Sequence, residues 1–190
     1  LLAILPQLMG SALHLNECEP QRADLLAALF PGCPVERHDA AQIDDYSDDA
    51  LKPGLVVMNP PFSACVHVAG RARGTAMRHL RSAFARLDPG GRLVAITGSG
   101  LSPHARSWHR SFVEIQETGT LVFTAAISGA VFAPHGTLVE TRLTIIDKRP
   151  AADPACFPAC CGVACDTGTL LAWIHARLPP RPACASQLGA

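Results

Sequence analysis

An Asn-Pro-Pro-Phe run ends a short apolar stretch of the chain, LVVMNPPFS at residues 55–63. Proline fixes its own φ and favours extended geometry in the residue before it, so Asn59 and Pro60 are held in one stiff conformation. Because neither Pro60 nor Pro61 has an N–H, the Asn59 side-chain oxygen and the Pro60 carbonyl can accept both hydrogens of one amino group. The ring of Phe62 offers a flat face on which a base can stack. The run predicts a site that activates an amine by positioning and electrostatics.

Two acidic residues upstream follow predicted strands. Glu17 follows the strand predicted at 13–16, and Asp39 follows the strand predicted at 35–38. A carboxylate can accept hydrogen bonds from both hydroxyls of a ribose, and an acceptor at Asp39 can take the amino group of an adenine. An exposed acid after a strand also often caps a helix, and Glu19, which precedes a helix-starting proline, is a rival for Glu17.

Short strands and helices alternate along the chain and must position these groups. The predicted strands are residues 13–16, 35–38, 55–58, 92–97, 120–127 and 138–147. The predicted helices are residues 21–30, 75–87, 107–119 and 169–178, with a short one in the acidic run at 42–51. This alternation predicts an α/β fold with a mostly parallel sheet, in which the last pair of strands could be antiparallel. In such sheets ligands bind at the carboxyl ends of the strands, where the candidate residues stand.

Apolar residues at helical spacing predict which helix faces are buried. The first helix places its apolar residues at Leu25, Leu26 and Leu29. The later helices place theirs at Met77, Leu80, Phe84 and Leu87, and at Trp108, Phe112 and Ile115. Each set falls on one side of a 3.6-residue helix, so we expect all three faces to contact the core.

The segment around Asn59 resembles the catalytic motif of amino-directed, S-adenosylmethionine-dependent methyltransferases, which include N6-adenine DNA methyltransferases and protein-glutamine methyltransferases. NECEP at 16–20 resembles their ribose-binding segment, and HDA at 38–40 resembles the segment that meets the cofactor's adenine. Residues 1–150 as a whole resemble the methyltransferase-like domain of bacterial and phage strawberry-notch-like methylase/helicase proteins.

The resemblance implies a Rossmann-like, seven-stranded α/β methyltransferase sheet with a reversed terminal hairpin, and S-adenosylmethionine as cofactor. The implied catalytic residues are Asn59, Pro60, Pro61 and Phe62. The implied cofactor-binding residues are Glu17, Asp39, Ala40 and Asn59. The family's first strand and glycine-rich loop, which hold the methionine part of the cofactor, are expected just before Leu1. The resemblance therefore implies a domain truncated at its start, over residues 1–150, followed at 151–190 by an Ala-, Pro- and Cys-rich tail or linker.

The implied reaction is methyl transfer to an exocyclic amine, with adenine N6 in DNA first. A protein-glutamine methyltransferase is the nearest rival, because an amide nitrogen needs the same two acceptors. A non-catalytic module that binds nucleic acid or partner domains stays open, as does a truncated product without a function of its own. The implied partners are DNA and a helicase domain in the same polypeptide. The substrate, target sequence and oligomeric state stay open.

The charge distribution limits how the chain can bind nucleic acid. Lys plus Arg and Asp plus Glu number 16 each in 190 residues, so there is no overall attraction to a polyanion. The local basic cluster consists of Arg71, Arg73, Arg78, Arg81 and Arg86. Arg71 and Arg73 are the candidate contacts to a nucleic-acid backbone. The other three fit a solvated helix face at least as well.

Cysteine spacing and hydropathy argue against two further classes. The chain has 8 cysteines, and the densest group, CFPACCGVAC at 156–165, contains no CxxC pair, so we predict no metal site. No apolar run reaches the length that spans a bilayer, and we expect a cytoplasmic protein without membrane contact.

Overall fold

The computed structural model describes residues 12–46, 48–60 and 74–184. The strands are β1 (Leu15–Asn16), β2 (Val35–Glu36), β3 (Leu55–Met58), β4 (Arg92–Gly98), β5 (Thr120–Ile127), β6 (Thr141–Asp147) and β7 (Val163–Ala164). The helical segments are α2 (Pro20–Leu29), η2 (Ala40–Gln42), α3 (Ile43–Tyr46), α4 (Thr75–Arg86), α5 (His109–Gln116), η3 (Gly129–His135) and α6 (Thr167–Arg177). Each strand and helix predicted from the sequence is present, with some ends shifted.

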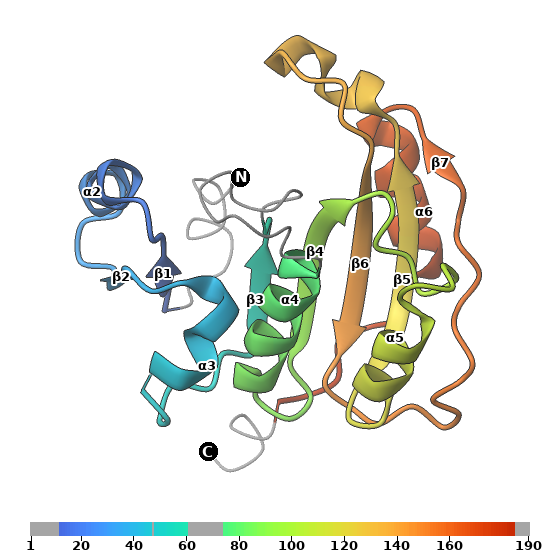
Figure 1. Cartoon of the computed structure of the whole chain (residues 1–190), viewed down its shortest axis with the longest axis horizontal. Helices are drawn as coiled ribbons and strands as arrows, with labels where there is room; N and C mark the ends of the chain where they lie inside the picture. Colours follow the sequence, from blue (N-terminus) through green and yellow to red (C-terminus); the bar gives the residue numbers. More distant parts are fainter. Residues whose placement is uncertain (1–11, 47, 61–73, 185–190) are drawn as a thin grey trace.

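The larger sheet has five strands in the order β3-β4-β6-β5-β7. β3 is parallel to β4, whereas β6 is antiparallel to both β4 and β5 and lies between them (Figure 1). This mixed α/β sheet with a reversed strand in its last hairpin confirms the predicted fold class. Since β5 runs parallel to β3 and β4, the carboxyl ends of all three strands meet at one edge, hereafter the carboxyl edge.

β1 and β2 form a separate, parallel two-stranded sheet. Figure 1 places this small sheet on the β3 side of the larger one, with β1 pointing the same way as β3. Within the described residues no strand lies hydrogen-bonded between β1 and β3, so the strands lie in two separate sheets. η2 and α3 join the two parts instead by packing against α4, where the Ser82 hydroxyl accepts a 3.0 Å hydrogen bond from the Asp44 N–H.

The core has two layers, one on each face of the larger sheet. α4 and α5 cover one face, and α6 covers the other (Figure 1). The predicted apolar faces of α4 and α5 are confirmed, because Met77, Leu80, Phe84, Leu87, Phe112 and Ile115 are all buried and Trp108 packs against them.

The predicted apolar face of α2 is wrong. The helix begins as expected, with Pro20 in its first turn and Glu19 as its N-cap. However, Leu25 and Leu29 are 58% and 59% exposed, and Ala23 is the buried residue of this helix. The small two-stranded sheet beneath α2 buries only the narrow side that Ala23 occupies.

The segment after β6 packs against the rest of the domain. Gln116 Nε2 donates hydrogen bonds of 2.8 Å and 2.9 Å to the carbonyls of Pro154 and Cys156. β7 pairs with β5, and α6 packs on the same strand. Cys184 is 1% exposed near Gly54. The predicted helix at 169–178 is present as α6, and the domain boundary at residue 150 stays a prediction.

Candidate functional site

Asn59 lies directly beyond the end of β3, at the carboxyl edge. Val56 and Met58 pack partly against the core, which places the Asn59 side chain past the last paired residue. Asn59 is exposed, and Pro60 behind it is buried. Pro60 has a fixed φ and restricts the backbone of the residue before it, so the backbone that carries the Asn59 amide is stiff. The remaining motif residues, Pro61 and Phe62, lie outside the described residues.

Glu17 follows β1, and one of its two carboxylate oxygens accepts hydrogen bonds. Its Oε1 accepts hydrogen bonds from the Glu19 N–H at 3.0 Å and from Arg22 Nη2 at 3.1 Å. The hydrogen bond from Arg22 lowers the pKa of Glu17 below its usual value, against the raising effect of partial burial. Oε2 accepts no hydrogen bond from a described residue. Glu19 caps α2, with hydrogen bonds from Gln21 N–H at 3.2 Å and Arg22 N–H at 2.8 Å, which leaves Glu17 as the available acid.

Asp39 follows β2 and caps the short η2 helix, where Ala40 is the first residue. Its Oδ1 accepts a 2.9 Å hydrogen bond from the Ala41 N–H. The Asp39 side chain is 62% exposed, and its Oδ2 has no hydrogen-bond partner in the described part of the chain. Asp39 therefore acts as a helix cap and still offers one acceptor to a ligand.

Two residues that the sequence analysis missed organise these acids. Asn16 Nδ2 donates to the His38 carbonyl, and Asn16 Oδ1 accepts from the His38 N–H, both at 3.0 Å. This pair of hydrogen bonds ties the loop after β1 to the loop after β2. An amide side chain as the last residue of a strand, one position before an acid, was the available signal.

His79 on α4 is the second missed residue. It is 8% exposed, and its Nε2 lies 3.6 Å from Asp39 Oδ1. Burial lowers the pKa of His79, against the raising effect of Asp39. The signal was its place between Met77 and Leu80, beside the apolar stripe of α4. α4 therefore contacts both the segment after β2 and the sheet that carries Asn59.

Two of the three arginines of α4 have structural partners. Arg81 forms an ion pair with Glu114 on α5. Arg86 is 4% exposed; it donates to the Leu51 carbonyl at 2.9 Å and lies 3.3 Å from Asp49 Oδ1. The expectation of a solvated face is thus wrong for Arg86, because its guanidinium anchors the loop before β3. Arg78 is exposed, and the candidate contacts Arg71 and Arg73 lie outside the described residues.

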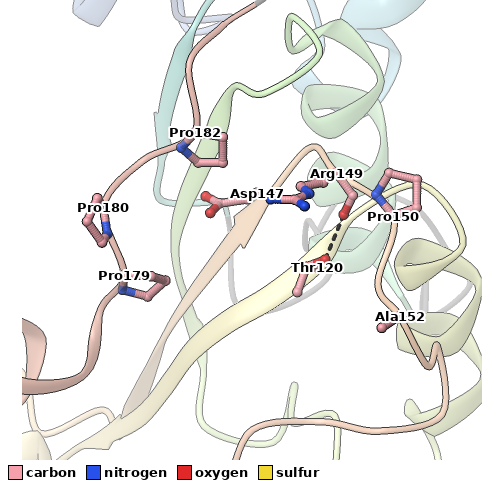
Figure 2. Close-up of a pocket in the computed structure, with 8 residues that line it drawn as sticks. All are labelled: Thr120, Asp147, Arg149, Pro150, Ala152, Pro179, Pro180 and Pro182. Carbon is pink, nitrogen blue, oxygen red and sulfur yellow. Dashed lines mark hydrogen bonds between the residues drawn. The ribbon is translucent and has the colours of Figure 1, made fainter.

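A cavity of about 380 Å³ lies at the opposite edge of the sheet, where β5 begins and β6 ends. Figure 2 shows its lining residues, Thr120, Asp147, Arg149, Pro150, Ala152, Pro179, Pro180 and Pro182. The Thr120 hydroxyl donates a 2.6 Å hydrogen bond to the Arg149 carbonyl across it. Since this edge faces away from Asn59, the cavity is separate from the candidate site.

The described residues also bear on metal and membrane contact. They contain no group of three or more His, Cys, Asp or Glu side chains arranged to hold a metal ion. None of the described helices has the length and apolar character needed to cross a membrane.

Solved structures share this architecture. A protein named as a type I restriction enzyme modification subunit from Vibrio vulnificus matches with a TM-score of 0.59 at 16% identity, over 91% of this chain and 43% of that protein. A protein named as a class I S-adenosylmethionine-dependent methyltransferase from Listeria monocytogenes matches with a TM-score of 0.60 at 12% identity, over 85% of this chain and 54% of that protein. The M protein of the type I restriction enzyme EcoKI matches with a TM-score of 0.53 at 19% identity, over 73% of this chain and 31% of that protein.

At these identities the likeness concerns the fold. No protein-family model and no curated protein matches the sequence. The chain spans about half or less of the length of these three proteins. The carboxyl edge holds Asn59, and the loops after β1 and β2 carry Glu17 and Asp39. The chain has the Rossmann-like α/β fold of S-adenosylmethionine-dependent methyltransferases.

Proposed function

We propose that this chain is part of an S-adenosylmethionine-dependent methyltransferase that acts on an exocyclic amine, with adenine N6 in DNA as the first candidate. The observation that carries the proposal is Asn59, exposed at the carboxyl end of β3 with Pro60 buried behind it. The structural neighbours support the same class, because they include a methyltransferase and two modification subunits of type I restriction enzymes.

The acids at the neighbouring strand ends fit the adenosine half of the cofactor. Glu17 Oε2 is open to ribose hydroxyls, and Asp39 Oδ2 is open to an adenine amino group beside the backbone of Ala40. The described residues offer no glycine-rich loop between β1 and β3 for the methionine half. We propose that high affinity requires a strand and loop in that position, as the strawberry-notch-like resemblance implies.

The chemistry follows from the acceptors at the motif. When bound, S-adenosylmethionine supplies a methyl group on a positively charged sulfur. Asn59 Oδ1 and the Pro60 carbonyl accept the two hydrogens of the target amine, which localises its lone pair on nitrogen, and Phe62 stacks on the base. During methyl transfer from the bound cofactor the amine nitrogen would gain positive charge, which the Asn59 and Pro60 oxygens would stabilise. Water takes the proton that the amine then loses.

The alternative functions differ in whether they depend on Asn59. A protein-glutamine methyltransferase uses the same acceptors on an amide nitrogen. A non-catalytic module of a larger helicase-type protein would bind DNA through salt-dependent phosphate contacts that do not need Asn59. Arg71 and Arg73 are the candidates for such contacts.

Calorimetric titration of S-adenosylmethionine tests the cofactor site. It is run on this chain and on a version extended upstream to supply a strand between β1 and β3. Glu17→Gln and Asp39→Asn should each weaken binding about tenfold to a hundredfold, the loss expected for one hydrogen bond to a charged group. Asp24→Asn, an exposed acid on α2, is the control and should change nothing. If neither version binds, the cofactor assignment fails.

A transfer assay then separates the catalytic and binding readings. It follows radioactive methyl from the cofactor to duplex DNA or to protein in the same extract. Measured at saturating cofactor, Asn59→Ala should reduce transfer by at least about a hundredfold, since the acceptors act on the transition state. DNA binding without transfer in the parent would support the non-catalytic module instead.

A further inference from the structure

The larger sheet buries an arginine that no described carboxylate neutralises. Arg86, Arg92 and Arg142 have exposed fractions of 4%, 7% and 9%. Arg86 pairs with Asp49, and Arg92 pairs with Asp147. Arg142, on β6, forms no ion pair with a carboxylate in the described parts of the chain. Because a guanidinium stays protonated in proteins, burial of Arg142 leaves a positive charge that needs an anion.

The Arg142 guanidinium contacts three other groups. Its Nε donates to the Ser99 carbonyl at 3.2 Å, and its Nη1 donates to Thr124 Oγ1 at 2.9 Å. Nη1 also lies 3.4 Å from the sulfur of Cys160. A main-chain carbonyl and a hydroxyl are neutral, so the sulfur is the one of these three acceptors that can become an anion.

A second buried group on the same face of the sheet lacks a partner. Thr144 lies two residues from Arg142 on β6, so both side chains point to one face, and it pairs in register with Thr124. Thr144 is 1% exposed, and its hydroxyl makes no hydrogen bond within the described residues. The polar side chains on this face therefore include a hydroxyl with unused hydrogen-bonding capacity.

The surroundings of Cys160 favour its ionised form while leaving it partly accessible. Burial acts to raise the pKa of the Cys160 thiol, but main-chain contacts with Gly162 and Ala126 and the hydrogen bond from Arg142 together hold it below the usual value. The residue is partly exposed, unlike Arg142 beneath it. A cation-paired, partly accessible sulfur is the environment in which protein thiols react.

We propose that Cys160 ionises to a thiolate that neutralises buried Arg142 and is the site at which this chain reacts with soft electrophiles. On ionisation the thiol proton passes to water. The sulfur then forms a bond to the electrophilic carbon as the leaving group departs with its electron pair. Alkylation removes the negative charge beside Arg142, which also holds the Ser99 carbonyl directly after β4.

The test is the pH profile of alkylation by iodoacetamide, resolved for each cysteine by mass spectrometry on the intact folded chain. Each rate is divided by its own plateau at high pH, which removes differences in exposure. A thiol whose pKa is lowered keeps a larger fraction of its plateau rate at about pH 6, because more of it is present as the reactive thiolate. We expect the retained fraction of Cys160 to exceed that of exposed Cys165 by at least about tenfold. An equal or smaller fraction overturns the proposal.

Two substitutions assign the effect to the guanidinium. Arg142→Lys keeps the positive charge and should preserve most of the difference, whereas Arg142→Gln should reduce it, leaving only the part due to the main-chain contacts with Gly162 and Ala126. If Arg142→Gln fails to fold, the thiolate ultraviolet absorbance that Cys160→Ser lacks tests the ionisation of Cys160 directly. That absorbance should rise at a lower pH for Cys160 than for the other cysteines, and a coincident rise contradicts the pairing. The outcome does not depend on whether the chain transfers methyl groups.

Discussion

The buried ion pair between Arg92 and Asp147 gives the sharpest stability prediction. These residues face each other across β4 and β6 and are 7% and 4% exposed. Arg92 Nε lies 2.6 Å from Asp147 Oδ1, Arg92 Nη2 lies 2.9 Å from Oδ2, and Nη2 also donates to the Pro179 carbonyl at 3.0 Å. The pair therefore connects the reversed strand to the segment after α6.

Asp147→Asn should be strongly destabilising. The substitution keeps the shape and one acceptor but leaves the Arg92 charge buried without a counter-charge. Breaking a buried pair costs about 3–5 kcal/mol, and retention of one acceptor places the expected loss near about 3 kcal/mol. With a urea m-value of about 2 kcal/mol/M, the unfolding midpoint should fall by about 1.5 M.

Two further variants test whether the unpaired Arg92 charge causes the loss of stability. Replacing both residues, Arg92→Met with Asp147→Leu, should recover stability to within about 1 kcal/mol of the unmodified chain, since no charge is then left alone. The exposed pair of Asp24 with Arg37 is the control, and Asp24→Asn should cost less than about 1 kcal/mol. The reasoning would be refuted if Asp147→Asn lost no more unfolding free energy than Asp24→Asn. It would also be refuted if the double variant were less stable than both single variants.

Three other perturbations follow from single contacts. A Cβ added at Gly129 would overlap the main-chain carbonyl of Leu138, so Gly129→Ala should cost at least about 2 kcal/mol in urea unfolding, whereas Gly100→Ala, which meets open space, should cost under about 1 kcal/mol. Gln116→Leu removes two hydrogen bonds to the segment after β6, and limited proteolysis should cut that segment at least about fivefold faster; unchanged cleavage would contradict the anchoring role. Burial lowers the pKa of His79, so the folded state binds fewer protons than the unfolded state, and stability present above about pH 6.5 is lost as pH falls through the folded-state pKa. His79→Gln should flatten that loss between about pH 7.5 and about pH 5, and an unchanged slope would exclude His79 as its source.

The sequence by itself determined the elements whose signals are local. The β-branched run of β3 and the apolar spacing of α4 predict the ends of those elements within about one residue. Hydrophobic periodicity and the turn residues that end an element are both set by neighbouring positions in the sequence. The order of strand, acid or amide, and helix also placed Glu17, Asp39 and Asn59 at strand ends. The reversed last strand followed from the resemblance to methyltransferases.

Only the tertiary structure decided which faces are covered and which polar groups meet. Leu25 and Leu29 have helical spacing, yet nothing in the described chain packs over them, since burial depends on what lies opposite a helix face. His79 reaches Asp39 across 40 positions, a contact that no local window contains. Cys160 likewise contacts Arg142 because the segment after β6 folds back over the face of the sheet to which the Arg142 side chain points. Hydrophobic periodicity can be read from the sequence, whereas the pairing of charges and the burial of helix faces depend on how the elements pack.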